Sequence, residues 1–91
     1  MPIPSIVVHG GAINPLTNKY NDGVSEAVQI GFGLLVDGRS ALDAVTEAIK
    51  SLEDNPIFNA GTGSWPNLKG KIEMDAIIID GSGIRSGAVA C

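Results

Sequence analysis

The sequence has very few residues that could cross-link it. Its 91 residues include one cysteine and one histidine. A single cysteine excludes an intramolecular disulfide, and one cysteine with one histidine cannot form the usual structural zinc sites. The fold must therefore be stabilised by its own core, and we expect a reducing compartment, the cytoplasm.

Long apolar runs and clustered positive charge are also missing. No stretch approaches the ~18 apolar residues of a membrane-spanning helix, and residues 1–5 lack the basic and apolar regions of a signal peptide. Six basic residues are scattered among ten acidic ones, giving a net charge of −4. Because nucleic-acid binding depends on clustered Lys and Arg, this balance argues against it. We expect a soluble protein that binds neither nucleic acid nor membrane.

The most informative stretch is residues 52–64, LEDNPIFNAGTGS. It begins as the last turn of an amphipathic helix and must leave that helix before Pro56, because a residue preceding proline disfavours helical angles. It ends in Gly61 and Gly63, which permit backbone angles that other residues avoid. This pattern predicts a shaped loop, the kind of segment that often carries a site on a rigid scaffold.

The rest of the chain predicts a small α+β domain in the order strand, helix, helix, strand, strand. A β-branched run predicts a buried strand over residues 5–9, followed by a glycine turn and a loop over residues 13–23. Apolar spacing predicts helices over residues 24–36, ending at Asp37-Gly38, and from the N-cap Ser40 to Leu52. Strands are predicted over residues 71–80 and 84–91, joined by a hairpin turn at 80–83.

The two predicted helices each have one apolar face. Gly31 and Gly33 would let the first helix pack closely against a neighbour. In the second helix the apolar residues recur at steps of three and four: Leu42, Val45, Ile49 and Leu52. We expect a sheet to cover both faces.

Taken alone, the polar residues leave the site open. The turn His9-Gly10-Gly11 could be an ordinary turn or an anion-binding nest, and His9 has no obvious nucleophile beside it. Asn59 is interpreted on these grounds as a side chain that caps its own loop. The residues by themselves do not choose between a structural and a functional role.

Several segments, taken together and in order, resemble the N-terminal part of the plant-type L-asparaginase/isoaspartyl aminopeptidase family. They are His9-Gly10-Gly11-Ala12, residues 40–45, 52–64 and 73–76, Asp80-Gly81, and residues 87–90. The resemblance implies an N-terminal-nucleophile (Ntn) hydrolase with an αββα sandwich. Such a precursor cleaves itself to expose a threonine, which attacks the amide of L-asparagine or of an isoaspartyl dipeptide.

The same resemblance implies roles for particular residues. A structural sodium ion would be held in the loop, mainly by backbone carbonyls of Leu52, Glu53, Asn55, Phe58, Ala60 and Thr62. Asn59 would orient the nucleophile, and the His9, Gly10 and Gly11 turn would support the active site. No organic cofactor is implied.

The nucleophilic threonine and the substrate-binding residues belong, by this resemblance, to a later β-subunit part. Residues 1–91 are thus expected to be the N-terminal fragment of a single domain and to be inactive alone. The expected partners are the nucleophile-bearing C-terminal portion and, in a homodimer, a second αβ unit. Thr62 matches a variable position of the sodium loop and is rejected as the nucleophile. The substrate would be a small molecule.

Two other functions remain open at this point. One is a glycosylasparaginase or a threonine protease of similar fold, since the substrate pocket cannot be read here. The other is a non-catalytic binding or structural subunit that keeps the loop and the sheet.

Overall fold

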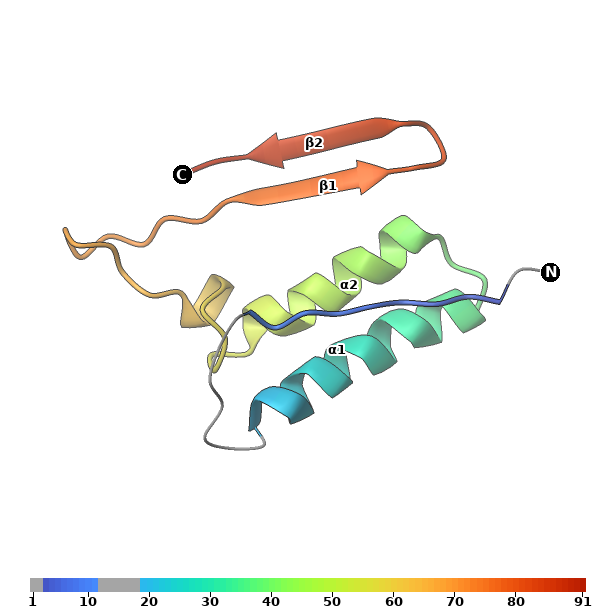
Figure 1. Cartoon of the computed structure of the whole chain (residues 1–91), viewed down its shortest axis with the longest axis horizontal. Helices are drawn as coiled ribbons and strands as arrows, with labels where there is room; N and C mark the ends of the chain where they lie inside the picture. The colour runs from blue at the N-terminus through green and yellow to red at the C-terminus, as the bar shows by residue number, and fades with distance from the viewer. Residues whose placement is uncertain (1–2, 12–18) are drawn as a thin grey trace.

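The computed structural model describes residues 3–11 and 19–91, which form an α+β arrangement as predicted (Figure 1). Its elements are α1 (Lys19–Val36), α2 (Ala41–Asp54), the short 3-10 helix η1 (Gly61–Gly63), β1 (Ala76–Asp80) and β2 (Arg85–Val89). The helices lie side by side, the N-terminal segment runs along them, and the β1–β2 hairpin lies beyond α2. No helix in the described ranges has both the length and the apolar character needed to cross a membrane.

Helix α1 begins at Lys19, five residues before the predicted start, so the predicted loop is wrong over residues 19–23; residues 13–18 lie outside the described part. The reason is tertiary. A Cβ added at Gly23 would lie 2.7 Å from the Phe58 ring, so a small residue there lets the helix pack on the core. That packing outweighs the weak helix propensity of glycine.

The predicted end of α1 is confirmed. Gly38 has a φ of 84°, its N–H donates to the Leu35 carbonyl at 3.1 Å, and the Arg39 N–H donates to the Leu34 carbonyl at 2.9 Å. These two bonds form a Schellman motif, which glycine favours because it has no Cβ to clash at positive φ.

Helix α2 begins as predicted. The Ser40 Oγ accepts a hydrogen bond from the Asp43 N–H at 3.0 Å, so Ser40 is the N-cap. The Asp43 carboxylate accepts from Arg39 Nε at 3.2 Å, an exposed ion pair. The local sequence thus fixes where this helix starts.

The helices pack on each other through their smallest residues. Ala27, Ala44 and Ala48 are buried, and a Cβ at Gly31 would lie 3.4 Å from that of Ala48. The close packing predicted for Gly31 is confirmed, whereas a Cβ at Gly33 would meet nothing within 4 Å.

The predicted apolar stripe of α2 is divided between two surroundings. Leu52 is buried with Phe58 in the core. Val45 and Ile49 instead remain 40% and 51% exposed and line a gap of about 750 Å³ between α2 and the hairpin. The expected covering of this stripe by a sheet is therefore incomplete within the described residues.

The strand predicted over residues 5–9 is wrong. The segment is extended, and its side chains Ile6 and Val8 pack against the helical core, but no described strand pairs with it. A strand requires a hydrogen-bonded neighbour. Within the described residues the hairpin strands pair only with each other.

The hairpin itself is confirmed, with shorter strands than predicted. Its antiparallel register places Ala76 opposite Val89 and Asp80 opposite Arg85. Residues 71–75 are outside β1, although the Asp75 carboxylate accepts from the Cys91 N–H at 3.0 Å.

Asp80 organises the turn of the hairpin. Its carboxylate accepts from the Ser82 N–H at 3.1 Å, from the Ser82 hydroxyl at 2.8 Å and from Arg85 Nη2 at 2.9 Å. The Ser82 hydroxyl, then Arg85 and the Ser82 amide, lower the pKa of Asp80 below its ordinary value of 3.8, because all three favour the ionised form. The turn is therefore held by short-range contacts.

Candidate functional site

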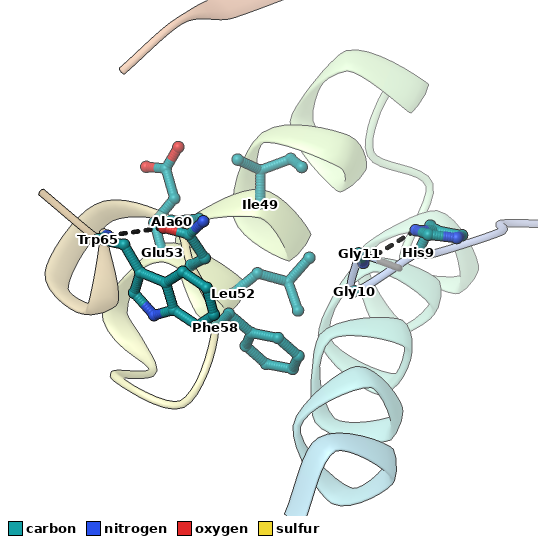
Figure 2. A pocket seen from close by; sticks show the side chains of 10 residues that line it. His9, Gly10, Gly11, Ile49, Leu52, Glu53, Phe58, Ala60 and Trp65 are labelled. Atoms are coloured by element: carbon teal, nitrogen blue, oxygen red, sulfur yellow. Dashed lines mark hydrogen bonds between the residues drawn. The ribbon is translucent and has the colours of Figure 1, made fainter. Parts of the chain in front are cut away.

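A pocket of about 410 Å³ brings the predicted glycine turn and the predicted loop together (Figure 2). Its walls come from the N-terminal segment, from α2 and from the loop that follows α2. The lining residues are His9, Gly10, Gly11, Ile49, Leu52, Glu53, Phe58, Asn59, Ala60 and Trp65. The volume lies within the range of small-molecule sites. Eight predicted site residues thus lie around one cavity, namely the glycine turn, Asn59 and four of the loop residues assigned to the ion, whereas Asn55 and Thr62 do not line it.

The glycine turn is held in shape from two sides. The His9 Nδ1 accepts a hydrogen bond from the Gly11 N–H at 2.9 Å, and Gly11 has a φ of 101°. A Cβ at Gly10 would lie 2.8 Å from Val24 and 2.9 Å from the Phe58 ring. Because Nδ1 accepts the bond from Gly11, Nε2 is the ring nitrogen left to bond another group.

Asn59 caps its own loop. Its side-chain Oδ1 accepts from the Trp65 N–H at 2.7 Å, the dashed line that ends at Trp65 in Figure 2. The local interpretation of Asn59 is therefore confirmed. The bond also orients the amide: with Oδ1 engaged, the exposed side chain has its Nδ2 hydrogens left as donors.

The loop between α2 and η1 folds back on its own carbonyl groups. The carbonyls of Leu52, Asn55 and Ala60 accept from the N–H groups of Asn55, Phe58 and Gly63 at 3.3, 3.2 and 3.1 Å respectively. The Asn55 side chain adds a bond from the Ile57 N–H at 3.1 Å.

Two glycines make the fold of this loop possible. A Cβ at Gly61, whose φ is 55°, would lie 2.5 Å from the Glu53 carbonyl oxygen. A Cβ at Gly63 would collide with the carbonyl oxygens of Pro56 and Phe58. The glycines let main-chain oxygens approach where a side chain would otherwise stand.

Main-chain oxygens are the donors that suit a hard cation. A carbonyl oxygen has two lone pairs, so one hydrogen bond leaves Leu52, Asn55 and Ala60 with remaining capacity. Across residues 3–11 and 19–91, His, Cys, Asp and Glu side chains form no group of three that could hold a metal. The loop thus presents carbonyl oxygens, the kind of donor that a hard cation binds.

Trp65 and Ile49 are pocket residues that sequence reasoning did not identify. Asn67 organises a turn after Trp65, accepting from the N–H groups of Lys69 and Lys71 at 2.9 and 3.0 Å. A large aromatic residue directly after a shaped loop, followed by Pro66, was the available signal.

Comparison with known proteins identifies the class to which this scaffold and pocket belong. A family model described as Asparaginase matches residues 2–91. The chain therefore belongs to the asparaginase family.

Individual relatives agree with this family assignment. The chain is 48% identical to the isoaspartyl peptidase/L-asparaginase of Danio rerio, over 97% of this chain and 29% of that protein. It is 45% identical to the protein of the same name from Homo sapiens, over 96% of this chain and 30% of the relative. It is 56% identical to the plant-type L-asparaginase of Pyrococcus horikoshii, over 94% of this chain and 29% of that protein. The chain thus spans less than a third of the length of these relatives.

Proposed function

We propose that this chain is the N-terminal part of a self-processing threonine amidohydrolase that releases ammonia from L-asparagine, hydrolyses isoaspartyl dipeptides, or does both. One observation carries the proposal: the family match includes both the turn at residues 9–11 and the loop at 52–64, which line the same pocket. Relatives that bear these enzyme names support it.

The chemistry divides between this chain and a later segment. A threonine hydroxyl attacks the amide carbonyl, its proton passes to the departing amine, and water hydrolyses the resulting ester. Thr62 lies in the loop and is not proposed as the nucleophile. The chain alone is expected to be inactive and to require a C-terminal β-subunit portion. The two portions would form an αββα sandwich that covers Val45 and Ile49. Two such αβ units would form a homodimer.

Asn59 is proposed to orient the nucleophile through its Nδ2 hydrogens. Its Oδ1 bond to Trp65 holds the amide in one orientation, which a directed donor requires. The His9-Gly10-Gly11 turn would support the site by packing on Phe58.

Substitutions at two asparagines test this role. Asn59→Asp keeps an acceptor for the Trp65 N–H and removes both Nδ2 donors, so we expect kcat of the full-length gene product to fall about 100-fold. Asn67→Asp is the matched control, because Asn67 also caps a loop through Oδ1 but lies outside the pocket. Equal kcat values for the two variants would reject a catalytic role for Asn59.

A sodium ion is proposed in the loop at Leu52, Glu53, Asn55, Phe58, Ala60 and Thr62. Bound cation stabilises the folded state by mass action. We expect a higher Tm in sodium chloride than in choline chloride at equal ionic strength. Gly61→Ala should abolish the difference, because its Cβ would meet the Glu53 carbonyl. Equal Tm values in the two salts would remove the ion from the proposal.

The first experiment for the whole proposal is intact-mass analysis of the full-length gene product, with ammonia release from L-asparagine and turnover of β-aspartyl dipeptides in the same sample. A precursor that splits and turns over either substrate supports the proposal. An unprocessed species without activity would favour a non-catalytic binding module.

A further inference from the structure

Trp65 is the single tryptophan of the chain, and it borders the pocket. Its side chain is 72% exposed although its main chain is tied to Asn59. Pro66 restricts Trp65 further, to extended backbone angles. Figure 2 shows the indole on the Phe58 side of the pocket, across from Gly10 and Gly11.

The walls around the indole are mainly apolar. Ile49, Leu52 and Phe58 line the pocket with Trp65, while Glu53 and His9 are its ionisable groups. A pocket with these walls suits an apolar group better than a doubly charged one, because an unpaired charge is costly beside apolar surface.

The two proposed substrates differ in what such a pocket could receive. Both substrates share an aspartyl half, which carries an α-amino and an α-carboxylate charge. They differ in the leaving group, which for asparagine is only ammonia. A dipeptide releases an amino acid whose side chain can be large and apolar. A cavity of about 410 Å³ has room for such a side chain, which asparagine lacks.

We infer that Trp65 determines specificity, by contacting the apolar side chain of the amino acid that leaves from an isoaspartyl dipeptide. This inference rests on the proposed function and goes beyond it by assigning the pocket to the leaving residue. An indole contacts an aromatic side chain in stacked or edge-to-face geometry, which adds to the gain from burial. β-Aspartyl-phenylalanine is therefore the favoured substrate over β-aspartyl-glycine.

The test compares kcat/KM of the full-length gene product and its Trp65→Ala variant on β-aspartyl-phenylalanine, β-aspartyl-glycine and L-asparagine. The quantity compared is the kcat/KM for β-aspartyl-phenylalanine divided by the kcat/KM for β-aspartyl-glycine. We expect Trp65→Ala to lower this ratio about 10-fold, and Trp65→Phe to restore most of it. Leu68→Ala is the control, since Leu68 is fully exposed outside the pocket. An equal loss on all three substrates, or no loss, would overturn the inference.

A second measurement separates this inference from the proposed function. If the wild-type gene product turns over none of the three substrates, the proposed function fails, and ligand binding still decides the role of Trp65. The difference in fluorescence between the wild-type gene product and its Trp65→Ala variant reports on the pocket, because this substitution removes the one tryptophan of residues 1–91. A saturable change with β-aspartyl-phenylalanine and none with β-aspartyl-glycine supports the inference, whereas identical responses to both dipeptides contradict it.

Discussion

The helical part of the molecule and the hairpin are stabilised by different means. The helices, the N-terminal segment and the loop at 52–64 share a core centred on Ala27, Ala48, Leu52 and Phe58. The hairpin has no buried side chain: Ile77 and Ile79 are 72% and 67% exposed. Its geometry comes from strand pairing and from the contacts of Asp80.

The conformation of the helical part thus depends on tertiary packing, whereas that of the hairpin depends on local contacts. Substitutions in the helical part should act through burial and shape, and their effects should spread to the pocket, because Phe58 belongs to both the core and the pocket wall. Substitutions in the hairpin should have small and local effects.

Phe58→Ala should have the largest effect. Phe58 is 2% exposed, and Tyr20 packs edge-to-face on its ring at a centroid distance of 6.0 Å. Losing a buried aromatic ring costs about 3–5 kcal/mol of unfolding free energy, which is much of the stability of a small domain. Urea unfolding, followed by the circular dichroism signal of the helices, measures this loss of unfolding free energy. Ile77→Ala, on the hairpin, should change the unfolding free energy by less than about 0.5 kcal/mol; similar losses for both variants would remove the distinction between the two parts.

Two glycines of the helical part should respond in opposite directions. Gly63→Ala should destabilise by about 1–3 kcal/mol, because its Cβ would meet main-chain oxygens of Pro56 and Phe58 that cannot easily move. Gly33→Ala should stabilise by about 1 kcal/mol, since it lies within α1 with open space around it. Thermal unfolding of the two variants measures this. A stabilised Gly63→Ala variant would show that the loop does not need its carbonyl arrangement.

Ser40→Ala should have an intermediate effect. It removes the acceptor of the Asp43 N–H and should cost about 1 kcal/mol, with fraying at the start of α2. Hydrogen exchange at residues 41–44 measures the fraying. Ser86→Ala, at an exposed hairpin position, is the control and should leave α2 unchanged; faster exchange in both variants would argue against a capping role.

Acidification should have the smallest effect, and we expect it at the turn of the hairpin. The pKa of Asp80 in the folded state lies below its ordinary value of 3.8, so ionised Asp80 stabilises the turn above that pH. The contribution is lost as the pH falls through the lowered pKa. Amide chemical shifts of residues 81–85 should move in this range. Asp80→Asn should abolish the pH response of the turn, and a response that persists in this variant would assign it to another group.

The sequence predicted the elements whose signals are local. The N-cap Ser40 and the glycine stop at Gly38 were confirmed, and the hairpin turn predicted at residues 80–83 lies one residue later, at 81–84. Each of these features depends on bonds between residues a few positions apart. The family resemblance placed His9, Gly10, Gly11 and Asn59 at one site; all four line one pocket, and their functional roles stay a prediction.

Other predictions failed for tertiary reasons. The start of α1 was misplaced because the turn-forming residues before Val24 become helical when Gly23 packs on Phe58. The strand over residues 5–9 has the right composition, yet within the described residues it has no strand to pair with. Trp65 was missed as a wall of the pocket because nothing local shows which loop lies across from Gly10 and Gly11.

The amino-acid sequence by itself determined the family, the helix caps, the hairpin and the presence in the loop of two glycines with backbone freedom. Local bonds and steric limits suffice for those features. Only the tertiary structure decided that α2 places its alanines against α1 and leaves Val45 and Ile49 facing the hairpin, and that Trp65 borders the pocket. These outcomes depend on which surfaces meet in space, because side chains pack against neighbours that are distant in the chain.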